Sequence, residues 1–186
     1  SGKFDQFQRN IPYSALITAF QGLVRQLLTE SKAKLQQWRE ELLVSLGSNG
    51  QVMINLISEL ELIIGSQPAL PELEAVESQN RFNLVFQAFI QVFCAKKHPL
   101  VIFLDNLHWA DSATLNLIQR LMTGVSPLPE SLFLIGTYEE NEVNSVHPLM
   151  RMLESLRQAG GIVNQITLTP LELEHTTQLI ADTFDS

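Results

Sequence analysis

Apolar residues recur at helical spacing through most of the first half of the chain. Such spacing puts them on one face of a helix and leaves polar residues on the other. The pattern predicts a first helix opening at Pro12, a second over residues 31–46, one or two short helices over 51–64, and a long amphipathic helix over 73–97. We interpret the aromatic stripe of the long helix as core, and it comprises Phe82, Phe86, Phe89 and Phe93.

The second half of the chain alternates between short apolar strands and helices. Residues 100–104, 131–138 and 162–168 are predicted strands, and residues 111–123, 148–159 and 170–184 are predicted helices. Residues 1–7 indicate the end of one more strand and its loop. Strands that alternate with helices through short loops are typical of a parallel sheet with helices on both faces. The predicted fold class is therefore α/β, in one domain.

The most informative stretch runs from Pro99 to Asp111. Its apolar part predicts a buried parallel strand, and the strand ends in an acid, Asp105. A carboxylate at the carboxyl edge of such a sheet can hold Mg²⁺ beside a nucleotide phosphate. The 186 residues contain no G-x-x-x-x-G-K-[ST] phosphate loop, so the sequence carries one half of a nucleotide site.

Charge and composition narrow the choice of partners. The chain has 12 basic and 20 acidic residues and a net charge of −8, which disfavours nucleic acid as the main partner. The single cysteine, Cys94, cannot form an internal disulfide, and we expect it in the core. Since no apolar run approaches the roughly 20 residues of a membrane span, we expect a cytoplasmic protein with no membrane partner.

The string F-L-D-N-L-H-W-A-D, from Phe103 to Asp111, resembles the Walker B region of the STAND and origin-recognition-complex-like AAA ATPases. Residues 134–138 resemble their sensor-1 strand, and residues 166–171 the strand that leads into their lid. The resemblance is strongest to the predicted ATPase modules of very large bacterial, often cyanobacterial, sensor kinases. It implies a P-loop NTPase-like sheet of the ASCE type, interrupted by a helical insertion and lacking the phosphate-loop strand.

The resemblance also implies a division of the chain. Residues 1–186 form a partial ATPase domain, in which 12–64 are the helical insertion and 99–111 the Walker B-like segment. Residues 131–142 are sensor-1-like, and 162–184 are the last strand and the start of the lid. In the family the sheet order is five-one-four-three-two, so the missing phosphate-loop strand would leave a gap between the sensor strand and the last strand.

The resemblance implies roles for four positions. Asp105 would hold Mg²⁺, Asn106 occupies the place of a second acid that polarises the attacking water, and Thr137 is the sensor near the γ-phosphate. Glu139 stands where the bacterial modules usually carry Arg. ATP and Mg²⁺ are the implied cofactors, provided that an upstream phosphate loop is present. The implied partners are kinase and sensor domains of the parent chain, and self-association stays open.

Two of these positions depart from the family pattern. Asn106 can orient a water but cannot accept its proton near neutral pH. The carboxylate of Glu139 would repel a γ-phosphate. We therefore weigh two hypotheses, a nucleotide switch with weak or no hydrolysis and a degenerate scaffold for protein contacts.

Other polar residues are given structural roles. We expect His108 and Trp109 to pack and to fix loops, and Asp111 to cap a helix. We read His98, His147 and His175 as surface or capping residues, because their spacing fits no shared metal site.

Overall fold

The computed structural model describes all residues except 8–10, 95–98, 124–130 and 185–186. The strands are β1 (Gly2–Lys3), β2 (Leu100–Asp105) and β3 (Leu132–Gly136). The helices are α1 (Ser14–Leu27), α2 (Lys32–Leu46), α3 (Gly50–Leu56), α4 (Glu61–Ile64), α5 (Ala75–Phe93), α6 (Ser112–Thr123), α7 (Pro148–Gln158) and α8 (Leu173–Phe184). Four 3₁₀ turns are η1 (Gly47–Asn49), η2 (Ser58–Leu60), η3 (Leu107–Trp109) and η4 (Glu140–Glu142).

The three strands form one parallel sheet in the order β1-β2-β3. The predicted α/β class is therefore confirmed, and every predicted helix is present with ends shifted by a few residues. In register, Lys3 lies opposite Asp105, and Leu104 lies opposite Gly136. The parallel register brings the carboxyl ends of all three strands to one edge of the sheet.

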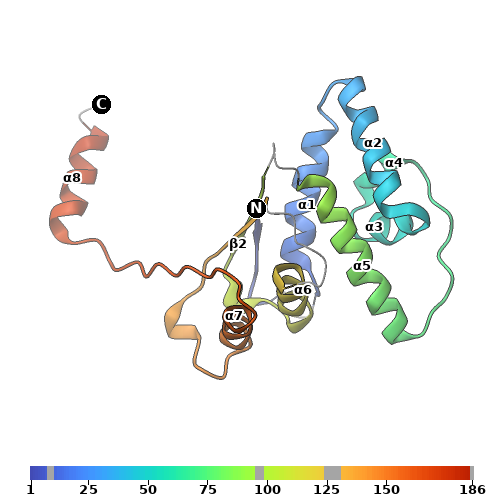
Figure 1. The fold of residues 1–186 in the computed structure, drawn as a ribbon. Coiled ribbons are helices and arrows are strands. Elements are labelled where there is room, and N and C mark those ends of the chain that lie inside the picture. Colours follow the sequence, from blue (N-terminus) through green and yellow to red (C-terminus); the bar gives the residue numbers. More distant parts are fainter. Residues whose placement is uncertain (8–10, 95–98, 124–130, 185–186) are drawn as a thin grey trace.

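The first half of the chain folds into the helices α1–α5, which lie together beside the strands in Figure 1. The aromatic stripe of α5 is core, as predicted: Phe86 and Phe89 are completely buried and meet Phe20 of α1 edge-on. Cys94 is also buried, and burial raises the pKa of its thiol to about 11. Residues 95–98 lie outside the described residues. They include the predicted end of this helix and His98.

The predicted strand over residues 162–168 is wrong. This segment pairs with no described strand, and three of its apolar side chains face solvent, with Ile162 89%, Ile166 84% and Leu168 87% exposed, while Val163 is partly buried against the core. Figure 1 shows it leaving the body of the molecule and ending in α8. A strand needs a neighbouring strand edge for its N–H and C=O groups. The outer edge of β3 is open in the described sheet, and residues 162–168 do not pair with it, so this segment does not form a strand.

Helices cover one face of the sheet more fully than the other. Ile102 and Leu104 of β2 are buried on the covered face. The alternate side chains of the strands, which share the opposite face through the β2–β3 register, are exposed: Val101, Phe103, Phe133 and Ile135. The expected burial of β2 on both faces is therefore met on one face only, and apolar side chains on the other are left without cover.

Close contact between β1 and α1 requires a glycine at position 2. A Cβ atom built there would lie 2.0 Å from the carbonyl oxygen of Ala15, a backbone atom that cannot rotate away. We expect Gly2→Ala to lower the free energy of unfolding by about 1–3 kcal/mol, as overpacked sites do. Urea unfolding measures this change.

Gly22, inside α1, provides the matched control, because a Cβ there meets nothing within 4 Å. Gly22→Ala should stabilise the chain by about 0.4–1 kcal/mol through its helix preference and a less flexible unfolded state. Equal effects of the two substitutions would show that β1 and α1 are not in close contact.

Candidate functional site at the carboxyl edge of the sheet

Three polar side chains meet where the strands end. Asp105 is the last residue of β2, Thr137 directly follows β3, and Lys3 ends β1. Two backbone hydrogen bonds fix the position of Thr137 relative to the end of β2. Thr137 N–H donates to the carbonyl of Leu104 at 3.0 Å, and Leu107 N–H donates to the carbonyl of Thr137 at 2.7 Å. These two bonds continue the β2–β3 pairing past the strands and hold Thr137 beside Asp105.

Asp105 and Thr137 are joined directly. The Thr137 hydroxyl donates to Asp105 Oδ1 at 2.6 Å and accepts a hydrogen bond from Asn106 N–H at 3.2 Å. A hydroxyl that donates to the carboxylate and accepts from the next amide has its orientation defined by two partners. The structure thus brings together the predicted metal-holding and sensor residues.

Asn106 occupies the left-handed region, with φ 57° and ψ 45°, which asparagine tolerates better than most residues. Its side-chain amide donates a long, 3.5 Å hydrogen bond to the carbonyl of Phe4, beyond the end of β1. The amide therefore links two strand ends in this structure.

Lys3 pairs with the second oxygen of Asp105, with 3.1 Å between Nζ and Oδ2. The hydrogen bond from Thr137, and after it the one from Lys3, hold the pKa of Asp105 below its ordinary value against the opposing effect of burial. Asp105 is therefore ionised at neutral pH. Because its folded-state pKa is depressed, its contribution to stability is present above the ordinary value of 3.8 and is lost as the pH falls through the folded-state pKa.

Removing the Thr137 hydroxyl should raise the pKa of Asp105 towards 3.8, because this hydrogen bond is the largest cause of the depression. The variants are Thr137→Val and, as the matched control, Thr137→Ser, which keeps a hydroxyl. Carbon-13 NMR titration of the Asp105 carboxyl group measures the pKa in each. An unchanged pKa in Thr137→Val would show that the hydroxyl does not bond the carboxylate in solution.

His108 and Trp109 fix the loop after the sensor strand, as predicted. The buried His108 accepts a hydrogen bond from Glu139 N–H through Nδ1 at 3.2 Å. Trp109 donates through Nε1 to Glu142 Oε2 at 3.1 Å. The backbone at Glu139 is thereby held while its side chain is exposed. The acidic turn η4 is tied to the turn that follows Asp105.

Asp111 caps α6, which confirms its predicted role: Oδ1 accepts from Thr114 N–H at 2.8 Å. Its Oδ2 accepts from the Thr114 hydroxyl and, at 3.3 Å, from Tyr13 N–H at the start of α1. Local sequence patterns do not reveal the Tyr13 contact, which joins the helical segment to the turn after Asp105 together with a 3.0 Å bond from Tyr13 N–H to the Thr114 hydroxyl oxygen. His147 caps α7 by accepting Leu149 N–H at 3.2 Å, as predicted, and His175 is exposed.

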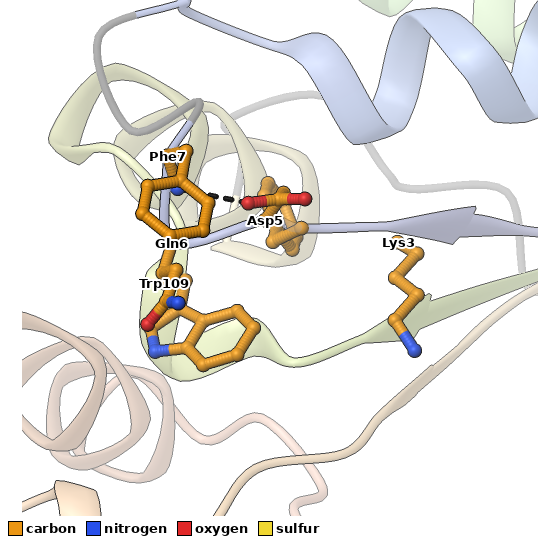
Figure 2. A pocket seen from close by; sticks show the side chains of 6 residues that line it. Lys3, Asp5, Gln6, Phe7 and Trp109 are labelled. Atoms are coloured by element: carbon orange, nitrogen blue, oxygen red, sulfur yellow. Dashed lines mark hydrogen bonds between the residues drawn. The ribbon is translucent and has the colours of Figure 1, made fainter.

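A cavity of about 380 Å³ opens beside this edge. Figure 2 shows its lining, with Lys3 on the strand and Phe7 and Trp109 on the loops that follow β1 and β2. Asp5 keeps the loop after β1 in shape, since its Oδ1 accepts Phe7 N–H at 2.8 Å. The cavity lies next to the Asp105 site, where parallel α/β sheets bind ligands.

The donor atoms at this edge suit a hard cation. Asp105 offers a carboxylate and Thr137 a hydroxyl, and Mg²⁺ is commonly held by one or two carboxylates together with phosphate oxygens. Among the described residues, no group of three or more His, Cys, Asp or Glu side chains could hold a metal without such help. The site therefore fits Mg²⁺ that arrives with a phosphate ligand.

Residues 1–135 match the AAA ATPase domain family, and the chain belongs to that family. Over 121 residues, 65% of this chain, it is 44% identical to hybrid signal transduction histidine kinase G of Dictyostelium discoideum. The match spans 4% of that kinase's length. No solved structure matches the chain. In the part of the chain that the structure describes, no helix is both long and apolar enough to cross a membrane.

Proposed function

We propose that this domain is a nucleotide-dependent switch within a larger signalling kinase. ATP binds at the carboxyl edge of the sheet, Asp105 holds the Mg²⁺ that comes with it, and Thr137 senses the γ-phosphate. Bound Mg²⁺ supplies positive charge that neutralises the phosphates. Binding changes the arrangement of the lid and passes that change to neighbouring domains. Family membership supports nucleotide binding in general, and the resemblance to a histidine kinase supports the signalling context.

The hydrogen bond between Thr137 and Asp105 carries the proposal. It joins a hydroxyl and an ionised carboxylate at the ends of adjacent parallel strands, with a geometry set by backbone pairing. Side chains held by such pairing need little reorganisation when a ligand arrives, and preorganisation of this kind favours binding.

The phosphate loop comes, on this proposal, from a segment outside residues 1–186. Two features of the structure support a missing strand–helix unit beside β3. The outer edge of β3 pairs with no described strand, and the apolar side chains Val101, Phe103, Phe133 and Ile135 are exposed on one face. Such an edge and face are costly to leave in water, and a strand with its following helix would cover both.

Hydrolysis is slow or absent on this proposal. Asn106 lacks a basic carboxylate, and its amide faces the Phe4 carbonyl. His108 fixes the backbone of Glu139, so the negative charge of the Glu139 side chain stays close to β3. The domain then signals whether nucleotide is bound. The partners that receive the signal are kinase and sensor domains of the same chain, or a second copy of it.

The first experiment compares the 186-residue chain with the longer natural chain that includes the residues before Ser1. The proposal predicts an in-frame G-x-x-x-x-G-K-[ST] there and Mg²⁺-dependent binding of a fluorescent ATP analogue by the longer chain only. A longer chain that contains the loop and yet binds no ATP at millimolar concentration would overturn the switch proposal.

One observation favours the alternative, a scaffold for protein contacts. Both Asp105 oxygens already have partners, Thr137 and Lys3, so the site is satisfied without a ligand. A scaffold would keep its fold and its partner contacts when ATP and Mg²⁺ are removed. A switch would lose or gain those contacts on the same treatment.

A further inference from the structure

Lys3 is placed beside Asp105 by the sheet itself. The two residues are register partners in the β1–β2 pairing, and register partners project from the same face of a parallel sheet. Phe4 N–H then donates to the carbonyl of Asp105 at 3.0 Å and closes the pairing beyond them. The strand register therefore places the Lys3 and Asp105 side chains close enough to form the ion pair.

The two oxygens of Asp105 are divided between two different donors. Oδ1 accepts from the neutral hydroxyl of Thr137 at 2.6 Å, while Oδ2 faces the Lys3 ammonium at 3.1 Å. The Lys3 side chain is 70% exposed and that of Asp105 is 31% exposed. Oδ1 is thus held by a hydroxyl whose position the backbone fixes, and Oδ2 is held by a solvent-exposed ammonium group that can move away.

A divalent cation must compete with that ammonium. Metal coordination needs a carboxylate lone pair, and a metal ion next to Lys3 would also face like-charge repulsion. Nucleotide phosphates change the balance, because their oxygens add ligands to the metal and negative charge beside Lys3. The cavity next to Lys3 leaves room for the displaced side chain.

We propose that Lys3 is a built-in competitor of divalent metal at Asp105, which keeps the nucleotide-free site without metal so that the metal enters together with the nucleotide. Lys3 is then a positioning residue that sets the order of binding. This inference rests on the proposed function, because it assigns Asp105 to Mg²⁺.

The test uses Mn²⁺ alone, with no nucleotide, on the 186-residue chain. Mn²⁺ accepts the same oxygen ligands as Mg²⁺ and broadens the NMR signals of nearby amides. The amides of Asn106 and Thr137 report binding at Asp105, separately from weak binding elsewhere on this acidic chain. The variants are Lys3→Met, Lys3→Arg, Lys3→Met with Asp105→Asn, and the control Lys32→Met, which removes the same charge from an exposed lysine of α2.

Lys3→Met should bind Mn²⁺ about two- to five-fold tighter at these amides, the change expected for loss of a partly exposed ion pair. Lys3→Arg and Lys32→Met should stay near the unmodified chain, and Asp105→Asn should abolish the gain. Equal binding by Lys3→Met and Lys32→Met, or no broadening in any variant, would overturn the proposal.

Mn²⁺ binding and ATP binding together distinguish the role of Lys3 from the proposed function. ATP binding by the longer chain is measured independently. Tighter Mn²⁺ binding in Lys3→Met without any ATP binding by the longer chain would count against the switch alone. ATP binding without the Mn²⁺ effect would count against the role of Lys3 alone.

Discussion

Asp111→Ala is expected to lower the free energy of unfolding by about 2–4 kcal/mol, which combines the loss of a helix cap with that of buried hydrogen bonds. The carboxylate of Asp111 accepts from the N–H of Thr114, the hydroxyl of Thr114 and the N–H of Tyr13. Tyr13 N–H also donates to the Thr114 hydroxyl oxygen at 3.0 Å, so one bond to the start of α1 does not involve Asp111. Thr114 is completely buried, so its hydroxyl has no access to water as a replacement. Removing one side chain would thus weaken both the start of α6 and its connection to α1.

Urea or thermal unfolding followed by circular dichroism measures this loss. Asp111→Asn should recover part of the stability, because it keeps one oxygen acceptor but places an amide group against other donors. Ser31→Ala is the matched control: Ser31 caps α2 through a single exposed 3.5 Å bond to Lys34 N–H, and its loss should cost below about 1 kcal/mol. Similar losses from Asp111→Ala and Ser31→Ala would show that Asp111 is an ordinary helix cap.

On the proposed function, Asn106→Asp together with Glu139→Arg should increase ATP hydrolysis by about 10²-fold or more in a chain that includes the phosphate loop. A positioned general base typically contributes about 10²–10⁴-fold, and Asn106→Asp would supply one. Aspartate tolerates the left-handed backbone at this position nearly as well as asparagine does. Glu139→Arg would replace a charge that repels the γ-phosphate with one that attracts it.

Single-turnover phosphate release, measured for the two single variants and the double variant, tests this prediction. Asn106→Ser is the control, since it changes the side chain without adding a base. Unfolding midpoints should accompany the rates, because an aspartate at 106 loses the amide donor to the Phe4 carbonyl. If the unmodified longer chain already hydrolyses ATP at a rate that these changes barely alter, slow hydrolysis is contradicted and so is the scaffold alternative.

Local patterns in the sequence were enough to predict most of the fold. Apolar spacing in the first half and the alternation of strands with helices in the second predicted α1–α8, and the acid after an apolar run located Asp105 at the end of β2. Thr137 was predicted as the sensor from the resemblance alone, and the structure joins it to Asp105 by a hydrogen bond. These features depend on residues close in the chain or on one strand pair.

The features that the sequence did not reveal depend on contacts between distant segments. Residues 162–168 have the apolar pattern of a strand, but a strand forms only when it pairs with another strand, and this segment does not pair with the open edge of β3. The Lys3–Asp105 pair depends on strand register, and the Tyr13–Asp111 bond depends on where the start of α1 lies relative to the start of α6. No local signal specifies either contact.

The switch proposal requires that a chain with both the phosphate loop and residues 1–186 binds ATP together with Mg²⁺ held at Asp105. Affinity is measured with Mg²⁺ and with EDTA, for the unmodified chain, Asp105→Asn and the control Glu77→Gln, which removes an exposed carboxylate from the first turn of α5. We predict that Asp105→Asn removes the Mg²⁺ dependence and weakens binding about ten-fold or more, a loss of at least about 1.4 kcal/mol, whereas Glu77→Gln binds normally. Equally tight Mg²⁺-dependent binding by Asp105→Asn would show that Asp105 does not hold the metal.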